Sequence, residues 1–307
     1  MKPLAVIGNV NVDLIMGPAA PWPQPGTESI VDHDELRVGG SAGNAALAWM
    51  ALGTPFEIAA SIGSDRFGDW LAESFGDHAR NWPVHGESTT LSVGITHPDG
   101  ERTFFTTRGH LPVFSLEDVF AVLDGKRLEG GIALLCGSFL THRLVEEYDR
   151  FFDWADRHGI AVALDTGWPL DGWTEVNMSA ARRWLSRCRI ALFNEVETTN
   201  LAGVCDPVEA GRQLRQGMPE GAIVVVKCGP KGAIAIDTDG KAFHADAPEV
   251  TVVDTIGAGD VFNAAFLAAF AAGKGLAESL AAGTGVASRA ISTNPRSYAP
   301  TPQDIPA

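Results

Sequence analysis

Short apolar runs alternate with helical patterns along most of this chain, and this alternation constrains the fold more than any other feature. The candidate strands are residues 4–8, 57–62, 131–136, 160–165, 190–194, 222–227 and 233–237. The candidate helices are residues 42–52, 67–79, 142–158, 207–216, 257–272 and 276–292. Because continuous apolar strands separated by helices are typical of a parallel sheet covered on both faces, the pattern predicts an α/β fold.

Two stretches, 27–38 and 91–107, break this rhythm because polar and apolar residues alternate in them. The second contains Pro98-Asp99-Gly100, a turn signal typical of a hairpin. Strands that are polar on one face do not suit the core of a doubly wound sheet. We therefore expect one α/β domain over residues 1–307, with a small antiparallel sheet inserted at about 11–38 and 88–110 as a lid. The proline-rich segment 18–25 is a rigid connector into this lid.

The charge of the chain limits the kinds of partner it suits. The 307 residues include 23 Lys and Arg against 38 Asp and Glu, which leaves a formal net charge of −15. Non-specific binding to nucleic acid or to an anionic membrane depends on clustered basic residues, so we expect neither partner. An anionic small molecule is not excluded, because a local site can differ in sign from the whole surface.

The cysteines and the first residues bear on the compartment. The chain has no C-x-x-C pair and no zinc-finger spacing around its cysteines, which are Cys136, Cys188, Cys205 and Cys228. Cys136 and Cys228 follow apolar runs and are expected to be small core residues at strand ends. Unpaired cysteines fit a reducing compartment, and no signal-peptide pattern opens the sequence. We expect a cytoplasmic protein.

A glycine-rich turn near the C-terminus, DTIGAGDVFNAAF from residue 254, leads into a helix that is apolar on nearly every face. A β-branched strand end at 250–253 precedes the turn. The free N–H groups at the start of such a helix suit a phosphate. Asp260 in the first turn is either a helix cap or a general base beside an anion site. A carboxylate there makes chemical sense if it must reach a hydroxyl that attacks the phosphate.

A second glycine-rich stretch, VGGSAGNAALAWMALG from residue 38, also leads into a helix. It is a tight turn, or a ligand loop in which Gly39 and Gly40 allow close approach and Asn44 donates hydrogen bonds. It also matches the G-x-S-x-G elbow of a serine hydrolase, with Ser41 as nucleophile. That alternative is disfavoured because an elbow normally follows several core strands, and no HGGG-type motif occurs. P-loop and Rossmann fingerprints are both absent from the sequence.

The two glycine-rich stretches, in this order, resemble the ribokinase-like (PfkB) carbohydrate kinase family over essentially the whole chain. The resemblance implies a ribokinase-like three-layer α/β/α sandwich with a mostly parallel central sheet and a small β-sheet lid. It implies transfer of the γ-phosphate of ATP, with Mg²⁺, to a hydroxymethyl group of a small carbohydrate. Because lids in this family often pair between subunits, it also implies a homodimer.

The resemblance assigns roles to both stretches. In the family the G-A-G-D turn donates backbone N–H groups to the transferring phosphate, and its aspartate is the catalytic base. The base is then Asp260, and the anion hole is formed by Gly257, Ala258 and Gly259. The first stretch is similar to the family's substrate-side loop, and GNVNVD at residues 8–13 resembles a strand end that binds acceptor hydroxyls. The implied acceptor-binding residues are Asp13, Asn11, Gly39, Gly40 and Asn44.

Two further segments resemble the nucleotide half of the family. Asn194-Glu-Val-Glu197 is similar to an N-x-x-E motif that organises magnesium and phosphate, partly through water. From the residues alone, Asn194 and Glu197 equally suit a helix N-terminus. KCGPKG at residues 227–232 resembles a strand-turn that borders the ATP site, which implicates Lys227, Gly229 and Gly232. The alternative is a solvated lysine followed by a β-turn.

The sequence departs from ribokinases at two places. Around residues 107–111 it reads TRGHL where ribokinases carry a G-A-N-type stretch, so Arg108 and His110 face the acceptor or merely form the exit of a surface hairpin. Ribose specificity is therefore not implied. STNPRS at residues 292–297 replaces a loop that helps form the monovalent-cation site of ribokinases, which leaves a monovalent-cation requirement open.

Three rival functions remain at this point. A nucleoside kinase of the same fold would place aromatic rings against a base, and aromatic residues near the lid are Trp22, Phe104, Phe105 and Phe114. These rings equally suit local core packing. A serine hydrolase would act through Ser41 without ATP. A protein that binds without catalysis is disfavoured, because both the candidate base and the anion turn are intact.

Overall fold

The computed structural model describes residues 1–98 and 101–298. Its central sheet has eight strands, ordered β14-β13-β12-β11-β10-β9-β1-β4. The strands are β1 (Leu4–Gly8), β4 (Glu57–Ala59), β9 (Ile132–Cys136), β10 (Ala161–Asp165), β11 (Ile190–Asn194), β12 (Ile223–Lys227), β13 (Ala233–Ile236) and β14 (Ala242–Ala245). Six of its strands pair in parallel, in the order β4-β1-β9-β10-β11-β12, whereas β13 pairs antiparallel with β12 and β14 antiparallel with β13. The expectation of a mostly parallel central sheet is confirmed.

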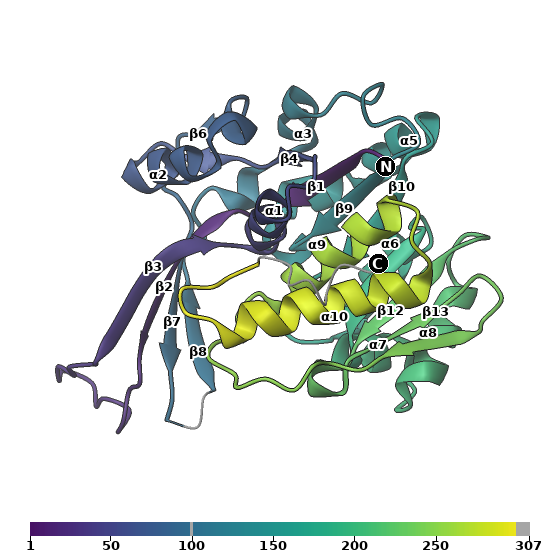
Figure 1. Ribbon diagram of the computed structural model, residues 1–307. Coiled ribbons are helices and arrows are strands. Elements are labelled where there is room, and N and C mark those ends of the chain that lie inside the picture. The colour runs from purple at the N-terminus through teal and green to yellow at the C-terminus, as the bar shows by residue number, and fades with distance from the viewer. Residues whose placement is uncertain (99–100, 299–307) are drawn as a thin grey trace.

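Helices cover both faces of this sheet (Figure 1). One layer contains α1 (Ser41–Ala51), α2 (Arg66–Phe75), α9 (Ala258–Ala271) and α10 (Leu276–Ser292). The other contains α3 (Leu116–Val122), α4 (His142–Glu146), α5 (Tyr148–Arg157), α6 (Glu175–Leu185), α7 (Glu195–Ala202) and α8 (Pro207–Gln216). Side chains of β1 alternate between the two cores, with Leu4 and Val6 in one and Ala5 and Ile7 in the other. The result is the α/β/α sandwich that the resemblance implied.

A second, four-stranded sheet projects from this body (Figure 1). Its order is β3-β2-β7-β8, with β2 (Asn11–Gly17), β3 (His33–Gly39), β7 (Leu91–Thr96) and β8 (Arg102–Thr106). Its central pair, β2 and β7, is parallel, so the expectation of a purely antiparallel sheet is wrong. Both strands run outward from the body, and their antiparallel partners β3 and β8 return. The expected hairpin turn falls partly on Asp99 and Gly100, which lie outside the described residues.

The projecting sheet has two chemically different faces because successive side chains of a strand point to opposite sides. The inner face, defined by Asp13, Ile15, Arg37, Arg102 and Phe104, contacts the body through its two arginines. The outer face carries Leu14, Met16, Leu36, Val93, Ile95 and Phe105. On this outer face Leu36 is 45% and Phe105 57% exposed.

Several local expectations need correction or completion. Residues 250–253 form no strand, and the N–H of Val253 donates to the Ile291 carbonyl instead of to a neighbouring strand. The expected helix at 142–158 is broken into α4 and α5. Helices α3, α6 and α7 and strand β14 were not anticipated. A further pair of two-residue strands, β5 (Ile62–Gly63) and β6 (Val84–His85), joins the segments beside α2.

The cysteines and the helix lengths can also be checked. Cys136 and Cys228 are buried at 1% and 7% exposure, as expected for small core residues. All four cysteines are free thiols. In the described part of the chain, no helix combines the length and apolarity needed to cross a membrane.

Candidate active site

The candidate site lies where several strands of the central sheet end. Asp165, Asn194 and Lys227 are the last residues of β10, β11 and β12. Because these strands are parallel, their last residues meet at one edge of the sheet, which is where ligands bind in open α/β sheets. Helix α9 begins at the same place, with Gly257 as its N-cap residue. The site therefore combines strand ends with a helix N-terminus.

Asp260 is the carboxylate of this site that stands closest to the turn. Its Oδ2 accepts a hydrogen bond of 2.9 Å from Nδ2 of Asn44 in α1. Burial raises the pKa of Asp260 to about 7, the nearby Asp165 adds to the rise, and the bond from Asn44 opposes it. A carboxylate with a pKa near neutrality is a competent general base at physiological pH. The two glycine-rich stretches, distant in sequence, are thus joined side chain to side chain.

The turn before α9 needs glycine for two reasons. Gly257 has φ 71°, in the left-handed region, and a Cβ on it would lie 2.6 Å from Nδ2 of Asn44. A Cβ on Gly259 would lie 3.3 Å from Nζ of Lys227. The N–H of Ala258 donates to the Thr255 carbonyl, so it is occupied and does not fit its assigned place in an anion hole. Among the described hydrogen bonds, none gives a backbone acceptor to the N–H groups of Gly257, Gly259 or Asp260.

The side chain of Lys227 lies beneath this turn and is only 12% exposed, so the alternative of a solvated lysine is wrong. Its Nζ lies 2.6 Å from Oδ2 of Asp165 and donates to Oδ1 of Asn263 at 3.2 Å. Nδ2 of Asn263 donates to the same Asp165 oxygen at 2.6 Å. Burial alone would lower the pKa of Lys227, but the carboxylates of Asp165 and Glu197 outweigh it and raise that pKa. A fixed positive charge therefore stands beside the turn.

Asn194 and Glu197 cap helix α7. Oε2 of Glu197 accepts from the N–H of Asn194 at 2.9 Å, and Oδ1 of Asn194 accepts from the N–H of Glu197 at 2.8 Å. Glu197 is 4% exposed, and burial together with the charge of Asp165 raises its pKa. The prediction of a helix N-terminus capped by Asn194 and Glu197 is confirmed. The Glu197 carboxyl group also interacts with the charge of Lys227. Within residues 1–98 and 101–298, no group of three or more His, Cys, Asp or Glu side chains is placed to hold a metal ion.

Asp13 forms the opposite side of the site, at the root of the projecting sheet. Its Oδ1 accepts a hydrogen bond of 2.7 Å from Nδ2 of Asn11. Burial raises the pKa of Asp13 to about 6, against the opposing charges of Arg37 and Arg296. A Cβ at Gly39 would overlap the Asp13 carboxyl group, and Gly40 has φ 85°. The glycines therefore allow the loop backbone to lie directly against the acceptor-side carboxylate.

Four of the candidate residues lie outside this cluster. Arg108 is exposed, and its carbonyl accepts from the Thr90 hydroxyl at 2.8 Å. His110 is 0% exposed, its Nδ1 accepts from the N–H of Thr90 at 3.1 Å, and burial lowers its pKa to about 4. It is a neutral core histidine. Gly229 and Gly232 both have positive φ; Gly229 begins the 3-10 turn that joins β12 to β13, and Gly232 follows it.

Two residues of the cluster were missed by the sequence reasoning. Asp165 ends a strand whose bounds were predicted, so its place at the carboxyl edge of the sheet was the available signal. Asn263 follows Asp260 by three residues on α9, the spacing that puts two side chains on one helix face. Neither signal is specific without the neighbours that the fold supplies.

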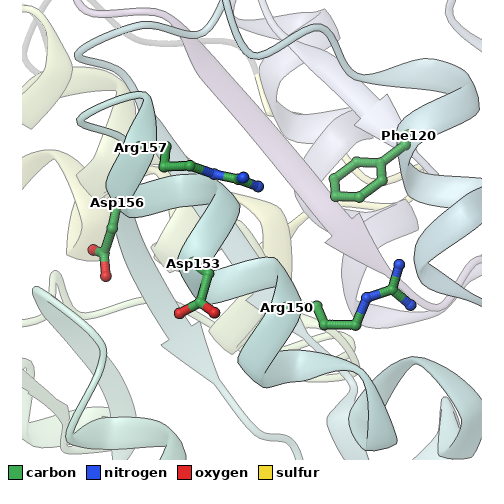
Figure 2. Close-up of a pocket in the computed structure, with 5 residues that line it drawn as sticks. All are labelled: Phe120, Arg150, Asp153, Asp156 and Arg157. Carbon is green, nitrogen blue, oxygen red and sulfur yellow. The ribbon is translucent and has the colours of Figure 1, made fainter.

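A surface hollow of about 510 Å³ lies elsewhere (Figure 2). It is lined by Phe120, Arg150, Asp153, Asp156 and Arg157, and Figure 2 shows the guanidinium of Arg157 directed toward the ring of Phe120. Most of its charges are already paired, since Arg150 contacts Glu147 and the two aspartates contact Arg187. The hollow lies between helices α3 and α5, and no strand of the described central sheet ends in it. Its volume is therefore no argument for catalysis.

Comparison with known proteins then decides the family. The family model described as "pfkB family carbohydrate kinase" matches residues 1–302. The chain belongs to the pfkB family of carbohydrate kinases. A ketohexokinase of Mus musculus is 24% identical over 94% of this chain and 95% of its own length. A ribokinase of Arabidopsis thaliana is 26% identical over 91% of this chain and 73% of its own.

Solved structures agree with this pfkB assignment. The structure of Arabidopsis thaliana ribokinase complexed with ribose and ATP has a TM-score of 0.78 and 24% identity, covering 95% of this chain and 93% of that one. A probable sugar kinase from Rhizobium etli has a TM-score of 0.80 at 20% identity, covering 96% and 95%. The ribokinase-like fold is thereby confirmed. As a pfkB member the protein is an ATP-dependent carbohydrate kinase, a phosphotransferase with a hydroxyl acceptor, and the serine-hydrolase alternative is set aside.

Proposed function

We propose that the enzyme transfers the γ-phosphate of ATP, with Mg²⁺, to a hydroxymethyl group of a small carbohydrate, with Asp260 as the base. The observation that carries this proposal is the pairing of a half-buried carboxylate, whose pKa is about 7, with N–H groups at the start of α9 that have no backbone acceptor among the described hydrogen bonds. Such N–H groups favour a phosphate, whereas the carboxylate repels one. A hydroxyl held between them relieves that conflict, because its proton goes to Asp260 as its oxygen attacks.

The acceptor would lie between the two halves of the site. Asp13 and Asn11 would bind its secondary hydroxyls, since both are buried beside the loop of Gly39 and Gly40. Asn44 would hold Asp260 in place through its 2.9 Å hydrogen bond. Its other amide hydrogen and its amide oxygen would form hydrogen bonds with the acceptor. Because phosphoryl transfer leaves a protein mostly positioning work, a small displacement of Asp260 should reduce turnover strongly.

The nucleotide side would use charge and backbone dipoles. The amides of Gly257 and Gly259 would face the transferring phosphate, and Lys227 would supply a fixed positive charge behind them. Mg²⁺, when bound, would neutralise charge on the phosphates. The residues that fit it are Glu197 and Asn194, acting through water, because their carboxyl and amide oxygens already serve the helix cap. The turn with Gly229 and Gly232 would border the nucleotide without touching the reacting atoms.

The projecting sheet would act as a lid. Its inner face carries Asp13, so closure of this sheet over the acceptor would exclude water from a site that would otherwise hydrolyse ATP. The outer face exposes Leu36 and Phe105, and apolar faces of this kind favour pairing with a second copy. We therefore infer a homodimer formed through the lids. The four free cysteines further support a reducing, cytoplasmic location.

A nucleoside acceptor is the second candidate, and one observation favours it. Phe104 is 46% exposed on the inner face, where its ring packs across Gly94 toward Ile15. The other candidate aromatic rings do not support it, since Phe114 is fully buried, Trp22 stacks on His97, and Phe105 points to the outer face. One exposed phenylalanine is weaker support than the polar groups around Asp13, so the carbohydrate is preferred.

A coupled assay of ADP release tests the proposal. Pentoses, ketohexoses, sugar acids, sugar phosphates and nucleosides would be compared at saturating ATP and Mg²⁺. We expect ADP to form only when an acceptor with a free hydroxymethyl group is present. Faster release with nucleosides than with any carbohydrate would favour the second candidate. Absence of ADP release with all of these acceptors would contradict the proposal.

A further inference from the structure

Three arginines from separate parts of the chain converge on one carboxylate, Asp254. Arg37 of β3 and Arg296 of the loop after α10 contact its Oδ2 at 2.5 and 3.0 Å. Arg102 of β8 contacts its Oδ1 at 2.8 Å. Each arginine side chain is only 14–16% exposed. The three guanidinium groups are therefore held together at the contact between the inner face of the lid and the body.

The arginines of this cluster have more hydrogen-bond donors than their acceptors use. Besides Asp254, the carboxylates near them include Glu35, 3.7 Å from Arg37, and Asp13, which stands beside Arg37 in the lid. Nη1 of Arg102 uses a neutral acceptor, the Thr255 hydroxyl at 3.0 Å. Nη2 of Arg37 and Nε of Arg102 are buried and have no hydrogen-bond acceptor among the described residues. Because a buried donor without a partner is costly, these groups are suited to an anion that the protein does not itself supply.

The arginines line a cavity that has room for such a group. The cavity measures about 320 Å³ and lies between the inner face of the lid, the segment before α9 and the loop after α10. Its lining includes Glu35 and Asp254 beside the three arginines, together with uncharged residues such as Ile15 and Thr96. Three guanidinium groups against two carboxylates leave an excess of positive charge, which favours an anion.

The cavity is continuous with the acceptor side of the site. Arg37 pairs directly with Asp13 across β2 and β3, so the two side chains stand on the same face as neighbours. Ile15, two residues further along the inner face, already lines the cavity. The positive charges of Arg37 and Arg296 lower the pKa of the Asp13 carboxyl group, although burial outweighs them. An acceptor bound at Asp13 would therefore extend toward the guanidinium groups.

We propose that the natural acceptor carries an anionic group, a carboxylate or a phosphate, which Arg37, Arg102 and Arg296 bind at the end remote from the phosphorylated hydroxymethyl group. Asp254 is then a positioning residue that holds the three guanidinium groups together. This inference rests on the proposed kinase function and adds the chemical class of its substrate. Ketose and pentose acceptors without a charge would leave the unpaired donors buried, and so would bind weakly.

Matched acceptor pairs test this directly. The coupled assay would compare ribose with ribonate, and fructose with fructose 1-phosphate, since each keeps a free hydroxymethyl group. We expect kcat/KM for at least one anionic member to exceed that of its neutral partner by about 30-fold or more, as charge-assisted hydrogen bonds allow. A preference for ribonate identifies a carboxylate, and one for fructose 1-phosphate identifies a phosphate. Equal or better use of the neutral members overturns the inference.

A variant set separates binding from folding. Arg37→Gln should raise KM for the anionic acceptor by about 10–100-fold with a smaller change in kcat, and Arg37→Lys should restore part of the loss. Arg80→Gln, which removes an exposed arginine paired with Asp77, is the matched control and should change neither constant. If Arg37→Gln fails to fold, Arg296→Gln replaces it. An anionic-to-neutral ratio within about threefold of wild type overturns the inference.

The two proposals fail differently. Turnover of neutral sugars alone, with Arg37→Gln indistinguishable from wild type, would overturn the anionic acceptor and leave the kinase function intact. Absence of ADP release with every acceptor would refute the kinase function and this inference together.

Discussion

Replacing Asp260 with asparagine separates its catalytic role from a structural one. Asn keeps the size of the side chain, and its Oδ1 can still accept the 2.9 Å hydrogen bond from Asn44. It removes the charge and the ability to take a proton. As a base, Asp260 contributes about 10²–10⁴-fold to the rate, so we expect kcat to fall by that factor. ATP binding should be retained, because Lys227 and the amides of the turn are unchanged.

The same substitution should stabilise the fold. Burial raises the pKa of Asp260 from 3.8 to about 7, so the folded protein holds this charge at a cost. A rise of roughly three pKa units corresponds to about 4 kcal/mol at pH above 7, as each unit is worth about 1.4 kcal/mol. The new amide hydrogens need partners, and a donor left without one costs about 1–3 kcal/mol, so we expect a net gain of about 1–3 kcal/mol in the free energy of unfolding.

The sign of the pH dependence follows from the raised pKa. The unfolded chain releases the Asp260 proton near pH 3.8, whereas the folded chain holds it to about pH 7. The folded protein therefore has its full stability from neutral Asp260 below about pH 3.8. It loses this stability as the pH rises from there to about 7. The advantage of Asp260→Asn should be largest at pH 8 and should shrink steadily toward pH 5.

Urea unfolding of both proteins at pH 5 and pH 8, with kcat measured at pH 8, checks these expectations. If Asp260 were only a helix cap, the variant would lose about 1 kcal/mol and keep its turnover within a few-fold. That outcome, or a stability difference that does not change with pH, would refute the reasoning.

Four further predictions follow from the same geometry. Because Asp260 must be ionised, kcat/KM at saturating ATP should fall as the pH drops below about 7, and more steeply below about 6 where Asp13 also gains a proton; a flat profile from pH 5.5 to 8 contradicts this. Lys227→Met should lose about 3–5 kcal/mol in urea unfolding, because Asp165 stays buried without its cation; a loss below 1 kcal/mol contradicts the buried pair. Gly257→Ala should lower kcat about tenfold or more because its Cβ meets Asn44, whereas Gly53→Ala, also at positive φ but with open space around it, should leave kcat unchanged. Since the guanidinium of Arg296 already contacts the Asp254 carboxylate, we expect turnover in Na⁺ and K⁺ to agree within about twofold, and a strict requirement for K⁺ would contradict this.

The parts of the fold that were predictable are those fixed by local periodicity. Strands at 4–8 and 190–194 and helices at 207–216 and 276–292 begin and end where the sequence pattern placed them. The strand predicted at 250–253 is wrong because β-branched residues favour an extended backbone but do not supply a neighbouring strand to pair with. Helix α7 was missed because its sequence, EVETTNLA, has almost no amphipathic periodicity and is begun by its capping box.

Site residues could be predicted where they lie together in one sequence motif. They could not be predicted where their role depends on a contact with a residue far away in the sequence. Asp260 and Asn44 stand out in their own glycine-rich stretches, and the fold joins them across 216 positions of sequence. Lys227 was assigned to the ATP site by resemblance, and the alternative of a solvated strand end stayed open because its partner Asp165 is 62 positions away. The arginine cluster is further still from any local pattern, since Arg37 and Asp254 are separated by 217 positions. His110 was misjudged for the same reason, since its burial depends on the packing around Thr90.

The stereochemical course of the transfer tests the central claim most directly. With ATP made chiral at the γ-phosphorus by oxygen isotopes and the best acceptor from the screen, ³¹P NMR of the product reads the configuration at phosphorus. Direct in-line attack by a hydroxymethyl group, with Asp260 taking the proton, predicts inversion and a phosphate ester on the primary carbon. Retention would show a phosphorylated enzyme intermediate, with a protein nucleophile such as Ser41, and would contradict the account.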